Sequence, residues 1–268
     1  MPESVSVYII ACNEAGRIGS AIRSVVDWAD EVVVVDSGST DDTVAVAESL
    51  GARVLHRSWE GYGPQKRFAE DSCRNNWVLN LDADEEVTPE LAKEIQQVLM
   101  APVDSQAAWN LPITDLLPGE ELPAWHAYSY VVPRLYNRLH AQMSPHPYQD
   151  RIEIRSGDVS TLRSRLLHRS FVSWSALINK INFYSSQVGE ERARVGRRPS
   201  PLRIMVEFPS KFLKVWIGRR YILRGSVGLQ MSITIAFMNM LRLSKTVEAI
   251  EKAATATTEE KHSASRAA

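Results

Sequence analysis

The sequence has few cysteines and no apolar run long enough to cross a bilayer. Its two cysteines, Cys12 and Cys73, exclude a disulfide framework, and a reducing compartment is expected. The first ten residues lack a basic region followed by an apolar core, which predicts no signal peptide and a protein kept in the cytoplasm. The uncharged run at 225–241 is shorter than the roughly 20 apolar residues of a membrane-spanning helix.

Two glycine-rich phosphate loops are also absent. Neither G-x-G-x-x-G nor G-x-x-x-x-G-K-[ST] occurs, so a Rossmann dehydrogenase and a P-loop nucleotide hydrolase lack their fingerprints here. The composition is otherwise ordinary for a globular protein, with 44% hydrophobic and 24% charged residues. The 268 residues are enough for one large domain, or for one domain and an appendage.

Short apolar runs alternate with helical patterns through the first hundred residues. Buried strands are predicted at 5–12, 31–37, 52–58 and 77–82, and helices at 17–29, 39–51, 64–73 and 88–100. This alternation predicts an α/β fold with a mostly parallel sheet and helices on both faces. Beyond it we expect partly antiparallel sheet and loops at 101–170, and helices from about Ser173.

Acidic residues cluster where the fourth predicted strand ends, in "WVLNLDADEE". Ligands of a doubly wound sheet bind outside the carboxyl ends of its strands. Two carboxylates spaced as Asp82 and Asp84 can reach one divalent cation, and hard oxygen ligands favour Mg²⁺ or Mn²⁺. The alternative is a turn capped by Asp82 with solvated acids around it. The metal is favoured because it supplies the missing counter-charge.

Two further polar clusters stand at predicted strand ends. Asn13 and Glu14 follow the first strand, and Asp36 ends the second. A carboxylate at the position of Asp36 can accept hydrogen bonds from a nucleobase or a ribose. The alternative is an Asx turn that leads into the next helix.

Positive charge is concentrated in the C-terminal third. The net charge is −1, but residues 192–224 contain ten Lys or Arg and one acid. This asymmetry predicts a basic surface that faces something anionic. Basic and aromatic residues before the uncharged run suit an interfacial segment at 203–243 on an anionic membrane surface, with apolar insertion by Phe212, Trp216, Ile217 and Tyr221. The alternative is a helical pair packed on the catalytic domain or on a dimer partner.

Three segments together resemble glycosyltransferase family 2: "YIIACNEAGRIGSAIRSV", "EVVVVDSGSTDDTVAVAESLGARV" and "WVLNLDADEEVTPEL". They cover residues 5 to about 100. The segments "YVVPRLYN" and "LRSRLLHRSF" resemble the lipopolysaccharide-core β-glucosyltransferases of that family. The resemblance implies the GT-A fold, a nucleotide-diphosphate-sugar donor and inversion at the anomeric carbon.

The resemblance also implies where the donor binds. It places Asn13 and Glu14 beside the nucleotide and Asp36 at the uridine. Lys66 and Arg67 stand where related sequences often have a basic residue, and they are expected to contact the nucleotide or the diphosphate. A solvated helix surface is the alternative for this pair.

The metal site implied by the resemblance has Asp84 as the principal ligand of Mg²⁺ or Mn²⁺. Asp82 would contact the ribose or a metal-bound water. His168 matches a histidine that many GT-A enzymes place near the metal. A purely structural role is the alternative for this histidine.

An inverting transfer needs a general base beside the acceptor hydroxyl. The family supplies an acid from a loop after the D-x-D pair. In this sequence Asp150, in "HPYQDRIEI", stands at that position, and Glu153 is the alternative. Tyr148 and Gln149 replace the residues that usually precede this acid.

The predicted organisation has a GT-A catalytic domain and a C-terminal helical extension. The catalytic domain covers 1–172, with a nucleotide-sugar-binding half at 1–100 and an acceptor or catalytic half at 101–172. A basic, membrane-associating helical extension follows at 173–245, and a frayed or disordered tail at 246–268.

These observations predict an inverting, metal-dependent transferase. It would move a glucose-like sugar from a UDP-sugar to a lipid-linked or lipopolysaccharide-core acceptor in envelope polysaccharide synthesis. We expect it on the inner face of the cell membrane as a peripheral protein, and expect no nucleic-acid partner. One alternative is a nucleotidyltransferase of similar fold, although "ACNEAGRIG" is poor in the glycine and basic residues typical of its loop. The other is a non-catalytic nucleotide-sugar-binding protein.

Overall fold

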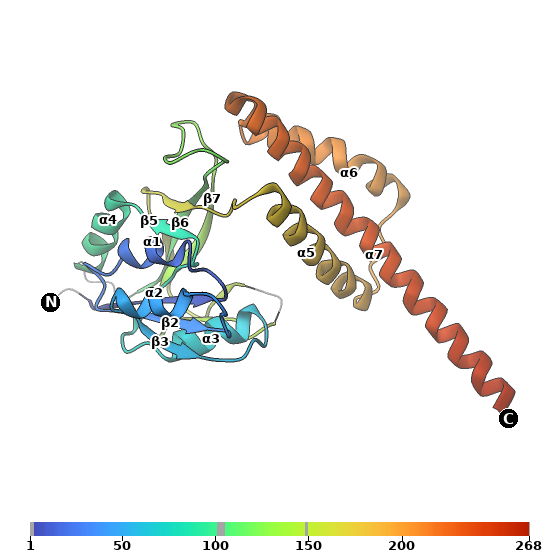
Figure 1. The fold of residues 1–268 in the computed structure, drawn as a ribbon, viewed down its shortest axis with the longest axis horizontal. Coiled ribbons are helices and arrows are strands. Elements are labelled where there is room, and N and C mark those ends of the chain that lie inside the picture. Colours follow the sequence, from blue (N-terminus) through green and yellow to red (C-terminus); the bar gives the residue numbers. More distant parts are fainter. Residues whose placement is uncertain (1–2, 101–104, 148–149, 268) are drawn as a thin grey trace. The chain divides into compact units, whose positions relative to one another are not determined.

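The computed structural model describes residues 3–100, 105–147 and 150–267, with side chains described up to Thr255 (Figure 1). The chain divides into two compact units. The first holds the described residues up to Leu116 together with Glu121–Pro123 and Ser129–Ser170. The second holds Leu117–Glu120, Ala124–Tyr128 and the described residues from Phe171 onward. The chain leaves the first unit at Ser170, close to the predicted boundary at 172.

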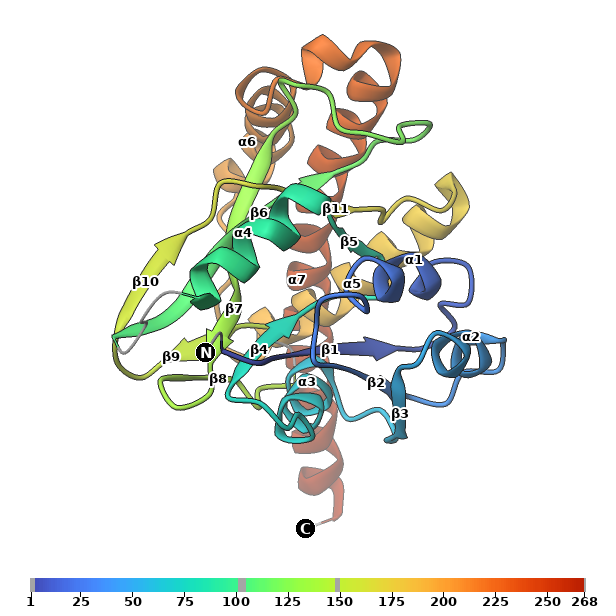
Figure 2. The ribbon, with the colours of Figure 1, turned by 90° about the vertical axis from the view of Figure 1, so that its left-hand side faces the viewer.

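A nine-stranded sheet forms the centre of the first unit (Figure 2). Its order is β3 (Arg53–His56), β2 (Glu31–Asp36), β1 (Val5–Ala11), β4 (Trp77–Asn80), β7 (Ser129–Asn137), β6 (Gln106–Asp115), β11 (Leu166–His168) and β5 (Glu85–Val87), with β10 (Asp158–Thr161) also paired to β6. The first four strands are parallel, β7 is antiparallel to both neighbours, and β5 is antiparallel to β11. A separate two-stranded sheet joins β8 (Ala141–Met143) to β9 (Ile152–Ile154).

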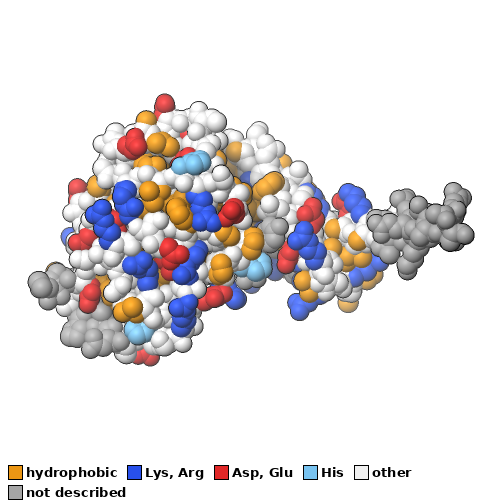
Figure 3. All heavy atoms as spheres, turned by 90° about the horizontal axis from the view of Figure 1, so that it is seen from below, with side chains coloured by type: hydrophobic (Ala, Val, Ile, Leu, Met, Phe, Trp, Pro, Cys, Tyr) orange, Lys and Arg blue, Asp and Glu red, His pale blue; other side chains and the backbone are white. Residues whose placement is uncertain are grey.

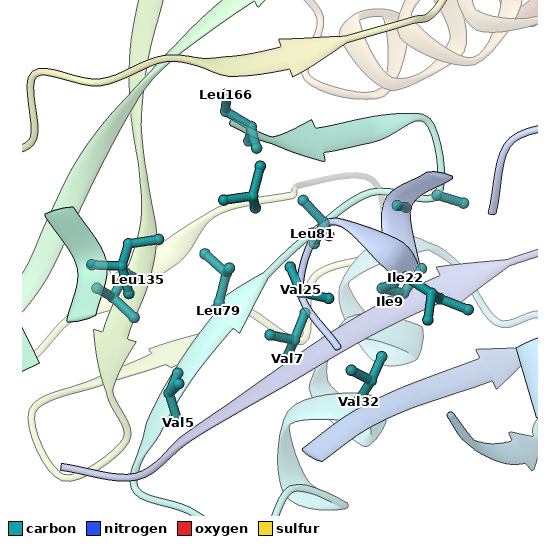
Figure 4. Packing of buried hydrophobic residues seen from close by; sticks show 14 of the residues in the cluster. Val5, Val7, Ile9, Ile22, Val25, Val32, Leu79, Leu81, Leu135 and Leu166 are labelled. Carbon is teal, nitrogen blue, oxygen red and sulfur yellow. The ribbon is translucent and has the colours of Figure 1, made fainter. Parts of the chain in front are cut away.

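Apolar residues on both faces of the sheet are covered by helices. Because successive side chains of a strand point to opposite faces, Val7 and Ile9 of β1 lie in one cluster and Tyr8 lies in another. The first cluster (Figure 4) includes residues of α1 (Ile18–Arg23), α2 (Thr43–Ser49) and α4 (Pro89–Met100). The second includes residues of α3 (Tyr62–Asp71). The predicted α/β, GT-A class with a mostly parallel sheet is confirmed.

The second unit is helical. It contains α5 (Trp174–Arg194), α6 (Pro201–Leu213), the short π-helix η1 (Lys214–Gly218), the 3-10 helix η2 (Tyr221–Arg224) and α7 (Gly225–Ala267) (Figure 1). The side chains of Ser173 and Ser200 cap α5 and α6, as N-cap serines do. A Cβ on Gly189 of α5 would lie 2.9 Å from the backbone of Lys245, so α5 and α7 approach closely there.

The long helix α7 includes residues that were expected to fray. The tail predicted at 246–268 lies in this helix as far as Ala267. Within the described residues, no helix combines the length and the apolar character needed to pass through a membrane. The surface in Figure 3 intermixes acidic, basic and apolar side chains, in keeping with the small net charge of −1.

Candidate active site

Two cations of the protein hold Asp82, which follows the carboxyl end of β4. Lys66 of α3 donates from Nζ to Asp82 Oδ1 over 2.7 Å, and Arg134 of β7 donates from Nη2 to Asp82 Oδ2 over 2.8 Å. Burial opposes the charge on Asp82, but Arg134 and Lys66 hold the pKa of that carboxyl far below its usual range. The protein itself therefore supplies part of the counter-charge that the acidic cluster requires.

Lys66 also reaches the predicted base. Its Nζ lies 2.6 Å from Oδ2 of Asp150, and only 2% of the Lys66 side chain is exposed. Burial opposes its charge, yet Asp82 and Asp150 raise the pKa of Lys66 above its usual value. Lys66 is thus a buried bridge between two carboxylates, whereas Arg67 pairs with Asp71 on the same helix. A contact of Lys66 with the donor stays a prediction.

Arg134 binds a second, fully buried acid. Its Nη2 donates to Glu85 Oε1 over 2.7 Å, and Glu85 Oε2 accepts the backbone N–H of Asp82 over 2.9 Å. No part of the Glu85 side chain is exposed. Burial raises the pKa of Glu85 to about 7, with Asp82 adding to the rise and Arg134 opposing it. Glu85 therefore stabilises the turn that carries Asp82 and Asp84.

Asp84 lies beside His168, the other residue predicted to bind the cation. Asp84 Oδ1 lies 3.5 Å from His168 Nε2, and His168 Nδ1 donates to Asp115 Oδ1 over 2.7 Å. Burial opposes protonation of the imidazole, but Asp115 and Asp84 raise the pKa of His168 to about 10. Arg17 Nη1 approaches Asp84 Oδ2 to 3.4 Å. Asp84 therefore lies beside two cationic side chains, at distances longer than those of an ordinary hydrogen bond.

These residues fit a divalent cation in part. Two neighbouring ligands of an octahedral cation, bound at about 2.1 Å, lie about 3 Å apart, close to the observed 3.5 Å between Asp84 and His168. A carboxylate on the other nitrogen, as Asp115 provides, is the usual partner of a metal-binding histidine. The described residues contain no group of three or more His, Cys, Asp or Glu that could hold a metal ion. Asp82, predicted as a further ligand, has both oxygens bound by Arg134 and Lys66.

The loops that follow β1 and β2 are joined by hydrogen bonds. Asn13, which adopts a positive φ of 57°, donates its N–H to Ser39 Oγ and accepts the N–H of Thr40, each over 2.9 Å. Glu14 donates its N–H to Thr43 Oγ1 over 2.7 Å. The two loops therefore form one braced edge at the carboxyl ends of these strands, where the donor nucleotide is predicted.

Asp36 is bound within its own turn. Its Oδ2 accepts the N–H groups of Gly38 and Ser39 over 2.8 and 3.0 Å, and its Oδ1 accepts the hydroxyl of Ser39. Burial opposes the charge, but these hydrogen bonds lower the pKa of Asp36. This is the Asx-turn geometry that the sequence left open. A contact of Asp36 with the uridine stays a prediction.

The two candidate bases differ in their partners. Asp150 shares Lys66 with Asp82 and so belongs to the acidic cluster. Glu153, on β9, lies 3.4 Å from its neighbour Arg151. The structure therefore links Asp150, and not Glu153, to the end of β4 through one side chain. Tyr148 and Gln149 lie outside the described residues.

Comparison with known sequences identifies the family. Residues 6–167 match the sequence model of Glycosyl transferase family 2, which is more than half of the chain. The chain belongs to this family. It is a glycosyltransferase, and not the nucleotidyltransferase or the non-catalytic binding protein that the sequence left as alternatives.

Three relatives show the range of similarity of this glycosyltransferase. An uncharacterized glycosyltransferase of Rickettsia felis is 38% identical over 259 residues, which cover 93% of this chain and 92% of the relative. The lipopolysaccharide core biosynthesis glycosyltransferase LpsC of Rhizobium meliloti is 28% identical, with 79% and 80% covered. The crystal structure of S. aureus TarS 1–349 matches with a TM-score of 0.47 and 15% identity, with 94% and 92% covered.

The site of this glycosyltransferase contains three residues that the sequence did not single out. Arg134, Asp115 and Arg17 contact the predicted acids and His168. Arg134 had a local signal, because a charge in the apolar strand "YVVPRLYN" needs a buried counter-charge. Asp115 had none, because its contact depends on the register of β6 and β11, in which Asp115 is the partner of His168.

Proposed function

We propose that this enzyme moves a glucose-like sugar from a UDP-sugar to a hydroxyl of a lipid-linked or lipopolysaccharide-core glycan, with inversion, during envelope polysaccharide synthesis. The match to LpsC over 79% of the chain supports this class of acceptor. The observation that carries the chemistry is the chain of contacts from Asp82 through Lys66 to Asp150. Through Lys66, the candidate base Asp150 is held close to Asp82, which is predicted to lie at the donor site.

In this proposal the nucleotide binds along the braced loops after β1 and β2, beside Asn13, Glu14 and Asp36. Asp84 and His168 would hold the divalent cation, Mg²⁺ or Mn²⁺. When bound, the cation supplies charge stabilisation for the diphosphate leaving group. The buried cations Lys66 and Arg134 restrain Asp82, so that the turn between β4 and β5 stays in one position.

Asp150 acts as the general base. Lys66 binds its Oδ2, which leaves Oδ1 as the oxygen that faces the acceptor in this proposal. That oxygen accepts the proton of the acceptor hydroxyl while the hydroxyl oxygen bonds to the anomeric carbon. The bond from that carbon to the diphosphate breaks in the same step. Attack from the face opposite the leaving group inverts the configuration.

The acceptor sets the location. A lipid-linked glycan is anchored at a membrane, so the proposed enzyme works as a peripheral protein on the cytoplasmic face of that membrane. A nucleotide sugar, which is water-soluble, reaches the braced loops from the cytoplasm.

The test of the base compares Asp150→Asn with Glu153→Gln. Sugar transfer from a panel of nucleotide sugars is measured with Mn²⁺ or Mg²⁺, and UDP binding is measured by calorimetry. Removing a positioned base lowers turnover by about a hundred- to ten-thousand-fold, so Asp150→Asn should lose this factor and keep its UDP affinity. Glu153→Gln should retain activity. The reverse pattern would transfer the role to Glu153.

The metal assignment is tested at Asp115, which contacts His168 and none of the other predicted ligands. Loss of such an outer partner typically lowers metal affinity by about ten- to a hundredfold. Mn²⁺ binding, followed by electron paramagnetic resonance with UDP present, should weaken by this factor in Asp115→Asn. The exposed Asp158→Asn is the matched control and should leave it unchanged. Equal Mn²⁺ affinity in all three proteins would remove His168 from the metal site.

A further inference from the structure

Apolar side chains of α6 lie on a half-buried inner side and on an exposed outer side. On the inner face, the rings of Phe208 and Phe212 stack with centroids 6.4 Å apart, and Phe212 stacks on Trp216 of η1 at 6.0 Å. Trp216 packs against a buried cluster of the second unit that includes Val215 and Tyr221. This inner face attaches α6 and η1 to the rest of the helical unit, in which α6 contacts α7.

The outer face of α6 and η1 is an exposed apolar stripe. It consists of Leu202, Met205, Val206, Pro209, Leu213 and Ile217. The exposed fraction of these side chains reaches 76% for Met205. It is still 46% for Val206. At 3.6 residues per turn these positions fall within an arc of about 120°. That is the width by which a helix normally faces a core.

Within the second unit no described residue covers this stripe, since all six of its side chains are exposed. An apolar stripe of this width on an amphipathic helix normally packs against protein or lipid. Ile222 and Leu223 of η2, 49% and 57% exposed, add apolar surface just after the stripe ends. The outer face is therefore an unpartnered contact surface of the second unit.

The charges beside the stripe are positive. Arg203, Lys214 and Arg220 are exposed. Glu207 is the only acid between Val195 and Val247, its side chain is 13% exposed, and it lies within 4.0 Å of both Arg203 and Lys211. The stripe thus has a cationic border with almost no accessible negative charge.

The apolar stripe and its cationic border together favour one binding partner over the other. A second copy of the chain, packed on the same face by a two-fold axis, would bring the cationic borders together. An anionic bilayer offers apolar tails to the stripe and negative headgroups to its border. We infer that the outer stripe of α6 and η1 lies on an anionic lipid bilayer, with the helix parallel to the surface. The inference rests on the proposed function only in that a lipid-linked acceptor lies at the same surface.

The residues assigned here to the lipid contact differ from those that the sequence predicted to insert. Of the four residues predicted to insert, only Ile217 is on the stripe. Tyr221 is 3% exposed, and Phe212 and Trp216 stack on the inner face. The membrane segment was predicted largely from its aromatic residues. In the structure these residues pack α6 and η1 onto the rest of the second unit.

The test uses the full-length protein and vesicles of phosphatidylcholine alone or of phosphatidylcholine mixed with the anionic lipid phosphatidylglycerol. Sedimentation should be strong with the anionic vesicles and weak with the neutral ones. It should weaken between 0.1 and 1 M salt, because the Debye length falls from about 10 to about 3 Å. The double variant Leu213→Ser/Ile217→Ser should bind anionic vesicles at least about tenfold more weakly, since two large apolar contacts are lost.

The matched control removes two equally exposed apolar side chains of the first unit, Met100 and Leu139. Met100→Ser/Leu139→Ser should bind as the wild type does. A charge variant, Lys214→Gln/Arg220→Gln, should lose about thirtyfold, because each cation near an anionic surface contributes about fivefold. Equal losses in the stripe variant and in its control would overturn the inference.

Light scattering tests the competing occupant. A dimer that Leu213→Ser/Ile217→Ser converts into a monomer, with unchanged vesicle binding, would assign the stripe to a second copy and overturn the lipid assignment. Hydrolysis of the donor without an acceptor, and the thermal midpoint, should be unchanged in all variants. A variant that loses vesicle binding but keeps donor hydrolysis has therefore lost the docking surface and not the active site. Absent hydrolysis in the wild type would instead count against the proposed function.

Discussion

Removal of Arg134 tests the central charge arrangement of the site. Arg134 is 9% exposed at its side chain and binds Glu85, which is fully buried, and Asp82. In Arg134→Met, Asp82 keeps Lys66, but Glu85 loses its cation. Breaking a buried pair in this way costs roughly 3–5 kcal/mol of unfolding free energy. We expect this loss at pH 8 in urea unfolding followed by circular dichroism.

Repeating the urea unfolding of Arg134→Met at pH 5.5 tests the direction in which its stability changes with pH. Without Arg134, the pKa of Glu85 rises beyond the value of about 7 to which burial already raises it. The folded variant then binds a proton that the unfolded chain releases, so its stability increases as the pH falls, by up to about 1.4 kcal/mol per pH unit. The control is Arg74→Met: the Arg74 side chain is 76% exposed, so its pair with Glu31 should contribute at most about 1 kcal/mol. Equal losses in Arg134→Met and Arg74→Met would refute the buried pair.

Two further variants test the loop that carries the base and a second buried acid. A Cβ on Gly63 would lie 2.3 Å from the carbonyl oxygen of His146, so Gly63→Ala should displace the loop before Asp150 and lower turnover more than UDP affinity, measured by transfer and calorimetry. Burial raises the pKa of Glu70, which accepts hydrogen bonds from Tyr136 Oη over 2.7 Å and from a backbone N–H. Such an acid loses stability as the pH rises from its unfolded pKa, about 4.3, to its folded value. Glu70→Gln should therefore flatten the fall in urea midpoint between pH 4.5 and 8, and an unchanged slope would exclude this origin.

Local patterns predicted the strands and helices of the first hundred residues, but not the order of the whole sheet. The alternation of strand and helix was enough for β1 to β4, because each parallel neighbour follows its own helix. The insertion of β7 between β4 and β6 depends on antiparallel pairing between Trp77 and Asn137, which are 60 positions apart in the chain. No pattern within a short window of the sequence contains that information.

Sequence patterns predicted the site residues that directly follow the ends of strands, but not the residues that contact them. Asp82 and Asp84 stand directly after β4, so their position was readable. One partner of Asp82 comes from another strand, Arg134 from β7, and so does one partner of His168, Asp115 from β6. These pairings depend on sheet order and register. The sequence did not predict that Lys66, which was expected to contact the donor, is buried and bridges Asp82 and Asp150.

The place of β7 between β4 and β6 has a consequence for synthesis of the protein on the ribosome. When β4 has been made, one of its edges can pair with β1, but the other waits for a strand that begins at Ser129. At roughly 5–20 residues per second, that edge stays open for several seconds. Glu85 likewise waits for Arg134, and β5 for β11. A nascent chain of residues 1–100 therefore has an open strand edge on β4 and an acid, Glu85, that still lacks its cation.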